Sequence, residues 1–267
     1  MQSQLILSTK LTAANTTQID DYFVSPPFKL MTLPSTHQLK AVQMSSSPGL
    51  LAGDKLFIQL RLAENTDLAL TTQAFTRVQS MNENEWAEQH SEFHLAKNSR
   101  LFYLPHPLVL HKDSALKQTT TITMADNSQL IYGEIVAIGR VLNQERFAFR
   151  QFSSYLKITH QDRPLLIDRI QWHPAKMNLT ALSQMEDFSH QGTFVYLNLA
   201  ADTLTLKQQL AELQQSYATE QQLLIGFSLL NDGGFTIRVL GHRAETIEKF
   251  FLQIGERLCC SFPGNII

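Results

Sequence analysis

Three carboxylates of the 267-residue chain stand in unusual local settings. Asp54 follows a glycine in the turn-rich stretch SPGLLAGD, Glu134 interrupts the otherwise uncharged run LIYGEIVAIG, and Asp168 closes the apolar run PLLID. Carboxylate oxygens are ligands for hard divalent cations, and they also form ion pairs or act as acids and bases. The acidic residues are scattered along the chain, without the paired spacing that a general acid and base would need.

The setting of Glu134 restricts what it can do. A charge within so apolar a strand is costly when it is buried without a partner. Glu134 must therefore be paired, face water or line an internal polar space. Arg140 lies on the same face if the strand continues, and Arg169 directly follows Asp168. Two interpretations stay open: structural ion pairs, or carboxylates lining a hydrophilic passage through which divalent ions exchange readily.

Two histidines, His90 and His94, have a spacing that puts them on one face of either a helix or a strand. The zinc-protease signature H-E-x-x-H is absent because Ser91 follows His90. A two-histidine metal site is possible, but no third ligand is nearby. Surface or edge histidines are the favoured interpretation.

The remaining histidines and cysteines that could act as nucleophiles or metal ligands are better interpreted as packing residues. His106 stands between two prolines in LPHPLVLH, with His111 beyond it, and a loop-packing role is favoured over ligand binding. Cys259 and Cys260 are adjacent near the end of an expected helix, which favours buried structural cysteines over a thiolate metal site. There is no nucleophile elbow, P-loop or dinucleotide fingerprint.

The elements that position these residues are mostly strands. Alternating apolar residues, β-branched and aromatic types and regular turn signals predict an all-β body up to about residue 200. No clean internal repeat stands out, so the sequence alone does not support a regular solenoid. The expected strands include residues 55–64, 66–80, 91–96, 100–110, 117–125, 129–141, 146–160, 163–172 and 193–200.

The pattern changes over residues 201–267, which predict a small α+β portion packed on the body. A helix is expected first, then a hairpin around NDGG at residues 231–234, then a closing amphipathic helix. We expect the following apolar residues to face inward from the two helices: Leu206, Leu210, Leu213 and Tyr217 in the first, and Ile247, Phe250, Phe251, Ile254 and Leu258 in the second.

Bulk composition excludes several classes of function. With 43% hydrophobic and 17% charged residues, the chain is an ordinary packed globular protein. The net charge of −2 and the lack of a basic cluster argue against nucleic-acid or anionic-membrane partners. The N-terminus does not resemble a signal peptide, no stretch is apolar enough to span a bilayer, and two cysteines make no disulfide framework. We therefore expect a soluble cytoplasmic protein.

Five segments together resemble the UreD family of urease accessory proteins, called UreH in some bacteria. They occur in the family's order and at compatible spacing, over roughly residues 20 to 200, and the C-terminal part also resembles the family's end. The segments are FVSPPFKLM (residues 23–31), SPGLLAGD (47–54), LTTQAFTRVQ (70–79), QLIYGEIVAIGRV (129–141) and RPLLIDRI (163–170).

The resemblance implies a single UreD-like domain over residues 1–267, with a helix-like stack of strands at residues 1–200 and the α+β portion at 201–267. It implies a non-enzymatic maturation factor that binds apo-urease on one side and UreF on the other, while UreF docks the GTPase UreG. Nickel would pass through a water-filled tunnel, with no permanently bound cofactor. The turn at residues 25–31 and the C-terminal helix are plausible contact regions.

By motif position, the resemblance implies that Asp54, Glu134 and Asp168 are transient metal ligands along this tunnel. Lys55 stands where the family often has a second acid, which weakens a two-carboxylate site at the turn. Supporting roles fall to Thr71, Thr72, Gln73, Arg140 and Arg169.

Two other classes of function stay open. One is a carbohydrate or small-ligand enzyme on a β scaffold, which would use the scattered carboxylates as acid and base. The other is a purely structural interaction protein, in which the carboxylates serve only in ion pairs. Hydrolysis by the purified chain alone would favour the first. Full urease activation by carboxylate variants would favour the second.

Overall fold

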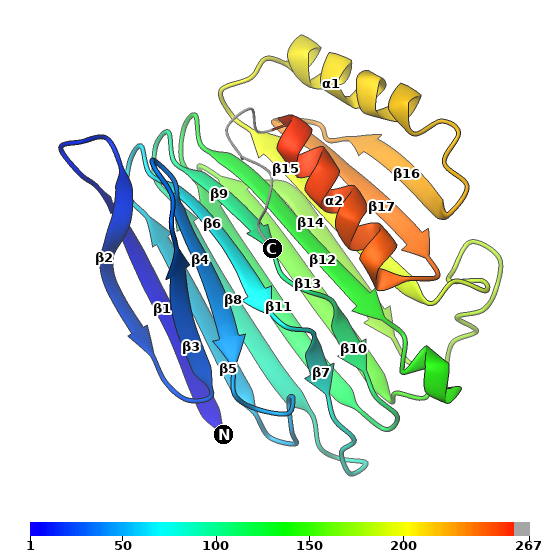
Figure 1. Ribbon diagram of the computed structural model, residues 1–267. Coiled ribbons are helices and arrows are strands. Elements are labelled where there is room, and N and C mark those ends of the chain that lie inside the picture. The colour runs from blue at the N-terminus through cyan, green and yellow to red at the C-terminus, as the bar shows by residue number, and fades with distance from the viewer. Residues whose placement is uncertain (259–267) are drawn as a thin grey trace.

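Two β-sheets lie face to face and form most of the protein in its computed structural model, which describes residues 1–258 (Figure 1). Within these residues, sheet I has seven strands and sheet II has ten. In spatial order, sheet I contains β14 (Arg163–Trp172), β13 (Gln151–His160), β11 (Ala115–Met124), β8 (Ala87–Leu95), β5 (Lys55–Leu62), β1 (Gln2–Leu11) and β2 (Thr17–Val24).

Sheet II is interrupted where two of its strands break and resume after a short loop. The short strand β7 follows β6, the short strand β10 follows β9, and β10 pairs with both β7 and β12. In spatial order, sheet II contains β16 (Leu223–Leu229), β17 (Gly234–Gly241), β15 (His190–Asn198), β12 (Gln129–Ala137), β9 (Arg100–Leu104), β6 (Asp67–Gln73), β4 (Leu39–Ser45) and β3 (Phe28–Leu33), besides β7 (Thr76–Val78) and β10 (Leu108–Leu110).

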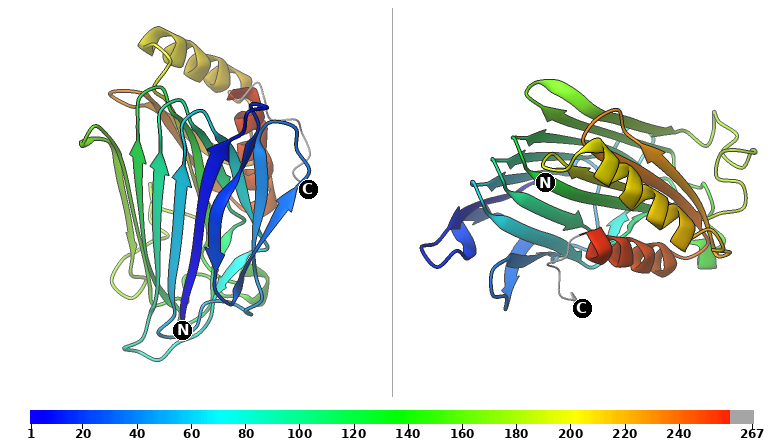
Figure 2. Two further views of the ribbon diagram at one scale, coloured as in Figure 1. Left: turned by 90° about the vertical axis from the view of Figure 1, so that its left-hand side faces the viewer. Right: turned by 90° about the horizontal axis from the view of Figure 1, so that it is seen from above.

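The chain winds between the sheets like a helix. From β4 to β13 it alternates between sheet II and sheet I, and each strand pairs in parallel with the one a turn earlier. Both views in Figure 2 show this two-layer stack. The predicted fold class, a mainly β, helix-like stack of strands with a small α+β C-terminal part, is confirmed.

Three successive turns of the winding share a four-residue motif, Ala-x-Asn-Ser/Thr. It occurs at residues 63–66, 96–99 and 125–128, and its asparagines Asn65, Asn98 and Asn127 all have φ near +58°. Asparagine tolerates this left-handed conformation better than most residues. The Ser or Thr hydroxyl donates to the alanine carbonyl at 2.6–2.7 Å in each turn.

The motif also joins one turn to the next. The Asn98 side-chain amide donates to Asn65 Oδ1 at 2.9 Å, and the Asn65 backbone N–H donates to the Lys97 carbonyl at 3.1 Å. The expectation that the chain has no clean internal repeat is therefore wrong at this corner. The repeat is hard to find by sequence because four residues recur at unequal intervals among strands of different length.

The C-terminal part extends and covers sheet II. Its hairpin β16–β17 pairs with β15, which lengthens the sheet, while α1 (Thr203–Ser216) contacts the hairpin and α2 (Ala244–Leu258) lies on the outer face (Figure 1). The predicted inward faces of both helices are confirmed, since Leu206, Leu210, Leu213, Ile247, Phe250, Phe251 and Ile254 are buried and Tyr217 and Leu258 are partly buried.

Small residues let α2 approach sheet II closely. A Cβ added at Gly192 on β15 would lie 2.7 Å from atoms of both Ile247 and Phe251. This interface is a second core, separate from the main core between the two sheets. Cys259 and Cys260 lie outside the described residues. No helix within residues 1–258 has the length and apolar character needed to cross a bilayer.

Candidate functional site

A band of polar side chains crosses the main core on the inner face of sheet I. Gln89 on β8, Gln118 on β11 and Ser154 on β13 are register partners, so their side chains share one face. Gln118 Nε2 donates to Ser154 Oγ at 3.0 Å. Ser91 and Thr120 form the next pair of the band. The same strands place Ala87, Phe93 and Leu95 in the apolar core, so the band interrupts an otherwise hydrophobic surface.

Sheet II presents a matching set of polar side chains. Glu134 on β12, Thr193 on β15 and Arg238 on β17 are register partners, and Gln43 on β4 pairs with Thr72 on β6. These residues share the inner face with core members such as those on β12 and β15. Polar groups from both sheets therefore meet between them.

Glu134 carries the least satisfied carboxyl group in this band. Its Oε2 accepts hydrogen bonds from the Tyr132 hydroxyl at 3.3 Å and the Ser154 hydroxyl at 3.5 Å, while its Oε1 is buried with no hydrogen-bond partner. Burial raises the pKa of Glu134 to about 7. The Tyr132 hydrogen bond opposes this rise, and the nearby Asp168 charge adds to it. The group is therefore poised to exchange its proton near neutral pH.

Asp168 lies at the edge of the same band and is ion-paired with Arg238 of sheet II. This partner comes from the opposite sheet, 70 positions along the chain. The expected supporting role of Arg169 beside Asp168 is wrong, because neighbours on a strand point to opposite faces. The Arg169 guanidinium instead lies 5.1 Å from the centre of the Tyr155 ring on the outer face.

The expected placement of Arg140 on the same strand as Glu134 is also wrong. Strand β12 ends at Ala137, and Arg140 lies beyond it in a turn, where its guanidinium forms an ion pair with Glu145. The Arg140 Nε–Glu145 Oε2 distance is 2.8 Å. Glu134 is thus left without a basic partner from its own segment.

Asp54 is buried at the corner before β5, and both of its oxygens have partners. Oδ1 accepts from the Met1 ammonium at 2.9 Å, and Oδ2 accepts from the Leu51 backbone N–H at 2.8 Å. Lys55, the next residue, points to Glu88, with 3.5 Å between Nζ and Oε2. These bonds hold the corner together, and they leave Asp54 less available to a cation than Glu134.

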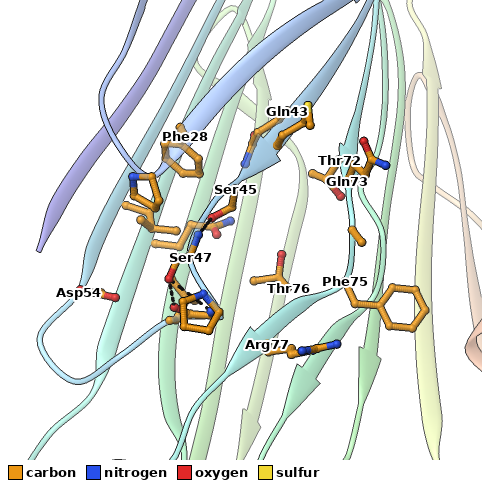
Figure 3. Close-up of a pocket in the computed structure, with 18 of the residues that line it drawn as sticks. Phe28, Gln43, Ser45, Ser47, Asp54, Thr72, Gln73, Phe75, Thr76 and Arg77 are labelled. Atoms are coloured by element: carbon orange, nitrogen blue, oxygen red, sulfur yellow. Dashed lines mark hydrogen bonds between the residues drawn. The ribbon is translucent and has the colours of Figure 1, made fainter.

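Two neighbouring cavities separate Asp54 from Glu134. The larger, of about 440 Å³, is lined by Asp54 and by residues of the neighbouring strands and turns, among them Gln43, Thr72 and Thr76 (Figure 3). The smaller, of about 50 Å³, is lined by Glu134. Four side chains line both cavities and so stand between them: Gln43, Thr72, Thr76 and Gln89.

Thr71 and Thr72, which were predicted to support the tunnel, point to opposite faces of sheet II. Thr72 points inward, lines both cavities and accepts a hydrogen bond from the His106 backbone N–H at 2.8 Å. Gln73 lines the larger cavity. Thr71 points outward and donates to the Leu104 carbonyl at 2.9 Å, which joins β6 to β9. Thr71 therefore supports the sheet and does not line either cavity.

Several residues of the band were not singled out by sequence reasoning. They are neutral polar residues on the inward side of alternating strands, and such a residue among apolar neighbours is the signal that could have found them. They are Gln43, Gln89, Ser91, Gln118, Thr120, Ser154 and Thr193, together with the cation Arg238.

His90 and His94 share a face, as predicted, but it is the outer face of sheet I. The His90 ring stacks on Phe57 at 5.5 Å, and its Nε2 lies 3.6 Å from Glu88 Oε2. Within residues 1–258, no group of three or more His, Cys, Asp or Glu side chains is arranged to hold a metal ion. The favoured interpretation of surface histidines agrees with this placement.

Comparison with known proteins identifies the relatives of this fold. The family model described as "UreD urease accessory protein" matches residues 2–265. The chain belongs to the UreD family. A urease accessory protein UreD from Actinobacillus pleuropneumoniae serotype 5b (strain L20) is 63% identical over 263 residues, covering 97% of each chain. One from Haemophilus influenzae (strain PittEE) is 62% identical over 268 residues, covering 97% of this chain and 99% of the relative.

Membership of the UreD family assigns the chain to urease maturation. Its relatives are named accessory proteins, so the family consists of maturation factors and not of enzymes. The resemblance stated from five sequence segments is confirmed over nearly the whole chain. A β-scaffold hydrolase is not supported.

Proposed function

We propose that this UreD-family chain is the nickel-insertion scaffold of urease maturation. It bridges apo-urease to UreF, and through UreF to the GTPase UreG, in the cytoplasm. Nickel is cargo that passes between the two sheets along the polar band, and no cofactor is permanently bound. The GTPase UreG switches nickel delivery on and off, while this chain provides the path along which nickel moves.

The observation that carries this proposal is the buried Glu134, whose Oε1 has no hydrogen-bond partner, inside a polar band that crosses an apolar core. Burying polar groups without full hydrogen bonding lowers the free energy of unfolding. Fold stability therefore does not explain the band. A route for a hydrated cation does explain it, because such a route needs oxygen ligands that are left free by the protein.

The types of side chain in the band are better suited to passing a nickel ion on than to storing it. Carboxylate, amide and hydroxyl oxygens are hard ligands, and nickel binds more tightly to imidazole or thiolate. Within residues 1–258, no three His, Cys, Asp or Glu side chains are grouped to hold a metal ion, so few strong ligands can reach one ion at once. An ion held by so few groups keeps much of its water and leaves easily.

Exposed apolar side chains within and just before residues 25–31 support a docking role for this segment. Tyr22 and Phe23 on β2 are 55% and 52% exposed, and Met31 on β3 is 44% exposed. Strands β2 and β3 lie at the same end of their sheets (Figure 1). Large exposed apolar residues of this kind are typical of protein-protein interfaces.

The test of this proposal is urease maturation in cells that carry Glu134→Ala or Asp168→Ala. We expect lower nickel content and lower urease activity, while the complex with urease, UreF and UreG still assembles in a pull-down. Glu92→Ala, on the exposed outer face of β8, is the control. Wild-type nickel content with both variants would reject the conduit.

The alternative of a purely structural interaction protein draws on a specific observation. Asp54 and Asp168 each form an ion pair, with the Met1 ammonium and with Arg238 respectively, which favours structural roles for them. Glu134 has no such explanation, so the Glu134 variant decides between the two functions. Loss of complex assembly in the Asp168 variant, with normal nickel loading in the Glu134 variant, would favour the structural role.

A further inference from the structure

Strand β16 forms an edge of sheet II with unpaired backbone groups. Among residues 1–258 it pairs with β17 alone and stands last in the strand order (Figure 1). The Leu230 N–H donates to the Gly234 carbonyl at 2.9 Å, which fixes the phase of this antiparallel ladder, because bonded and non-bonded pairs alternate along it. Every second residue of β16 therefore points its N–H and C=O groups to the free side, namely Leu223, Ile225, Phe227 and Leu229. No backbone group of the described chain is hydrogen-bonded to them there.

This edge lacks the features that protect the other edges of the two sheets. Edge strands commonly carry charges, prolines or bulges, which prevent unwanted strand pairing. Strand β2 carries Asp20 and Asp21, β3 carries Lys29, and β14 carries Arg163 and Pro164. The sequence of β16, LLIGFSL, has no charge and no proline, and its pairing with β17 has no register shift. A regular, uncharged edge of this kind readily accepts a further strand.

The side chains of β16 are apolar on both faces and incompletely covered. Ile225, Phe227 and Leu229 are partly buried in the core between sheet II and its helices, whereas Leu223 is buried there. Leu224 points to the opposite face and is 53% exposed. A strand added at this edge would cover the partly buried residues, and apolar, uncharged side chains suit it best.

The strand is complementary to itself about its central residue, Gly226. When a second copy runs antiparallel with Gly226 opposite Gly226, the free backbone groups of Ile225 meet those of Phe227, and those of Leu223 meet those of Leu229. Each of these pairs exchanges both of its N–H···O bonds. On the face toward α1, the pairing sets a β-branched side chain beside an aromatic one, which is a favourable cross-strand pair.

We propose that β16 pairs with β16 of a second copy of this chain about a two-fold axis at Gly226, which joins two copies of sheet II into one continuous sheet. Charge favours a second copy as the occupant, because two uncharged edges meet without repulsion, whereas two β2 edges would bring Asp20 and Asp21 of both copies together. A two-fold axis uses the same patch on both copies and so closes the assembly at a dimer. Strands β2 and β3 lie at the far end of their sheets and stay free for other partners. The dimer does not depend on the nickel route.

Gly226 allows a test that leaves the single chain intact. A Cβ added at Gly226 would meet the Arg238 carbonyl oxygen at 4.0 Å and no closer atom, so a side chain fits there. In the dimer, the two residues at this position face each other across the axis, with about 4.5 Å between their Cα atoms. Gly226→Lys therefore places two ammonium groups opposite each other. The control Thr123→Lys adds the same charge at an exposed position on β11, in the middle of sheet I.

Sedimentation equilibrium of the full-length chain measures the dimer. A single pair of strands buries less area than a standard interface, so we expect a monomer–dimer equilibrium with a Kd on the order of 10–100 μM. Gly226→Lys should weaken the dimer about fivefold or more, because like charges directly opposite on paired strands repel. Thr123→Lys should match the wild type. An equimolar mixture of Gly226→Lys and Gly226→Glu should dimerise at least as tightly as the wild type, which also shows that both variants are folded.

Amide hydrogen exchange followed by NMR shows whether β16 is the surface used. We expect the N–H groups of Ile225 and Phe227 to exchange fast in dilute protein and slowly in concentrated protein, because the second copy bonds to them. Those of Leu224 and Gly226 bond to β17 and should exchange slowly at both concentrations. A chain that stays monomeric up to about 1 mM would overturn the proposal, as would a dimer in which Ile225 and Phe227 still exchange fast. Protection of these two groups on addition of urease or UreF, and not on concentration, would also overturn it and assign the edge to a strand of that partner.

Discussion

Replacing Glu134 by glutamine tests whether this carboxyl group is desolvated in the folded chain. Burial raises its pKa from the ordinary 4.5 to about 7. Between these two pH values the folded chain holds a proton that the unfolded chain has lost. Stability therefore falls as pH rises from about 4.5 to about 7 and is constant above that. Glutamine has nearly the same shape and no charge, so it removes this loss.

The magnitude follows from the pKa difference. Each pH unit between the folded and unfolded pKa corresponds to about 1.4 kcal/mol. A rise from 4.5 to about 7 therefore gives a loss of roughly 3 kcal/mol for the wild type at pH 8. We expect Glu134→Gln to be more stable than the wild type by up to about 3 kcal/mol at pH 8, and nearly equal to it at pH 4.5.

The assay is guanidinium unfolding of the wild type and Glu134→Gln, followed by circular dichroism at several pH values between 4.5 and 8. The matched control is Glu92→Gln, because Glu92 is an exposed glutamate on the outer face of β8. Its difference from the wild type should be small and independent of pH. A Glu134→Gln difference that is equally independent of pH would refute the reasoning, since the carboxyl group would then be as well solvated in the folded chain as in the unfolded one.

Three further predictions concern the corner turns, the helix contact and the corner before β5. Asn98→Ala should lower the free energy of unfolding, measured by chemical denaturation, by about 1–2 kcal/mol, because alanine is strained in the left-handed conformation of this turn. Asn98→Gly should lower it less, and equal losses for the two variants would contradict this. Gly192→Val should destabilise the chain by about 1–3 kcal/mol in thermal unfolding, because its side chain collides with Phe251 and displaces α2; an unchanged melting temperature would contradict it. Asp54→Ala should lower the free energy of unfolding, measured by chemical denaturation, by about 1–3 kcal/mol, because it leaves the Leu51 N–H unpaired. An unchanged free energy of unfolding would show that water replaces the carboxylate.

The local structure of most elements could be predicted from sequence. Alternation with period two marked the strands, and the spacing of Leu206, Leu210 and Leu213 marked the buried face of α1. These patterns are short-range, because burial of one face sets the residue types within a single element. The constraint on Glu134 was equally local, since a charge in an apolar strand must have an exceptional environment.

The partners of the site residues depended on tertiary structure. Asp168 pairs with Arg238 because β14 and β17 lie on facing sheets, whereas Arg169, its sequence neighbour, points away. Arg140 was assigned to the face of Glu134 on the assumption of a continuous strand, and the strand ends before it. Strand order and strand ends are decided by packing across the whole core, which no local pattern records.

The sequence by itself determined the family, the strand-rich body and the presence of a carboxylate within an apolar strand. Only the tertiary structure decided what surrounds that carboxylate. His106 looked like a packing residue in a proline loop, and the winding of the chain puts it among the residues that line the same cavity as Glu134 and Gln43. The physical reason is that a site between two sheets is assembled from strands far apart in the chain. Its chemistry arises from their register and not from spacing along any one of them.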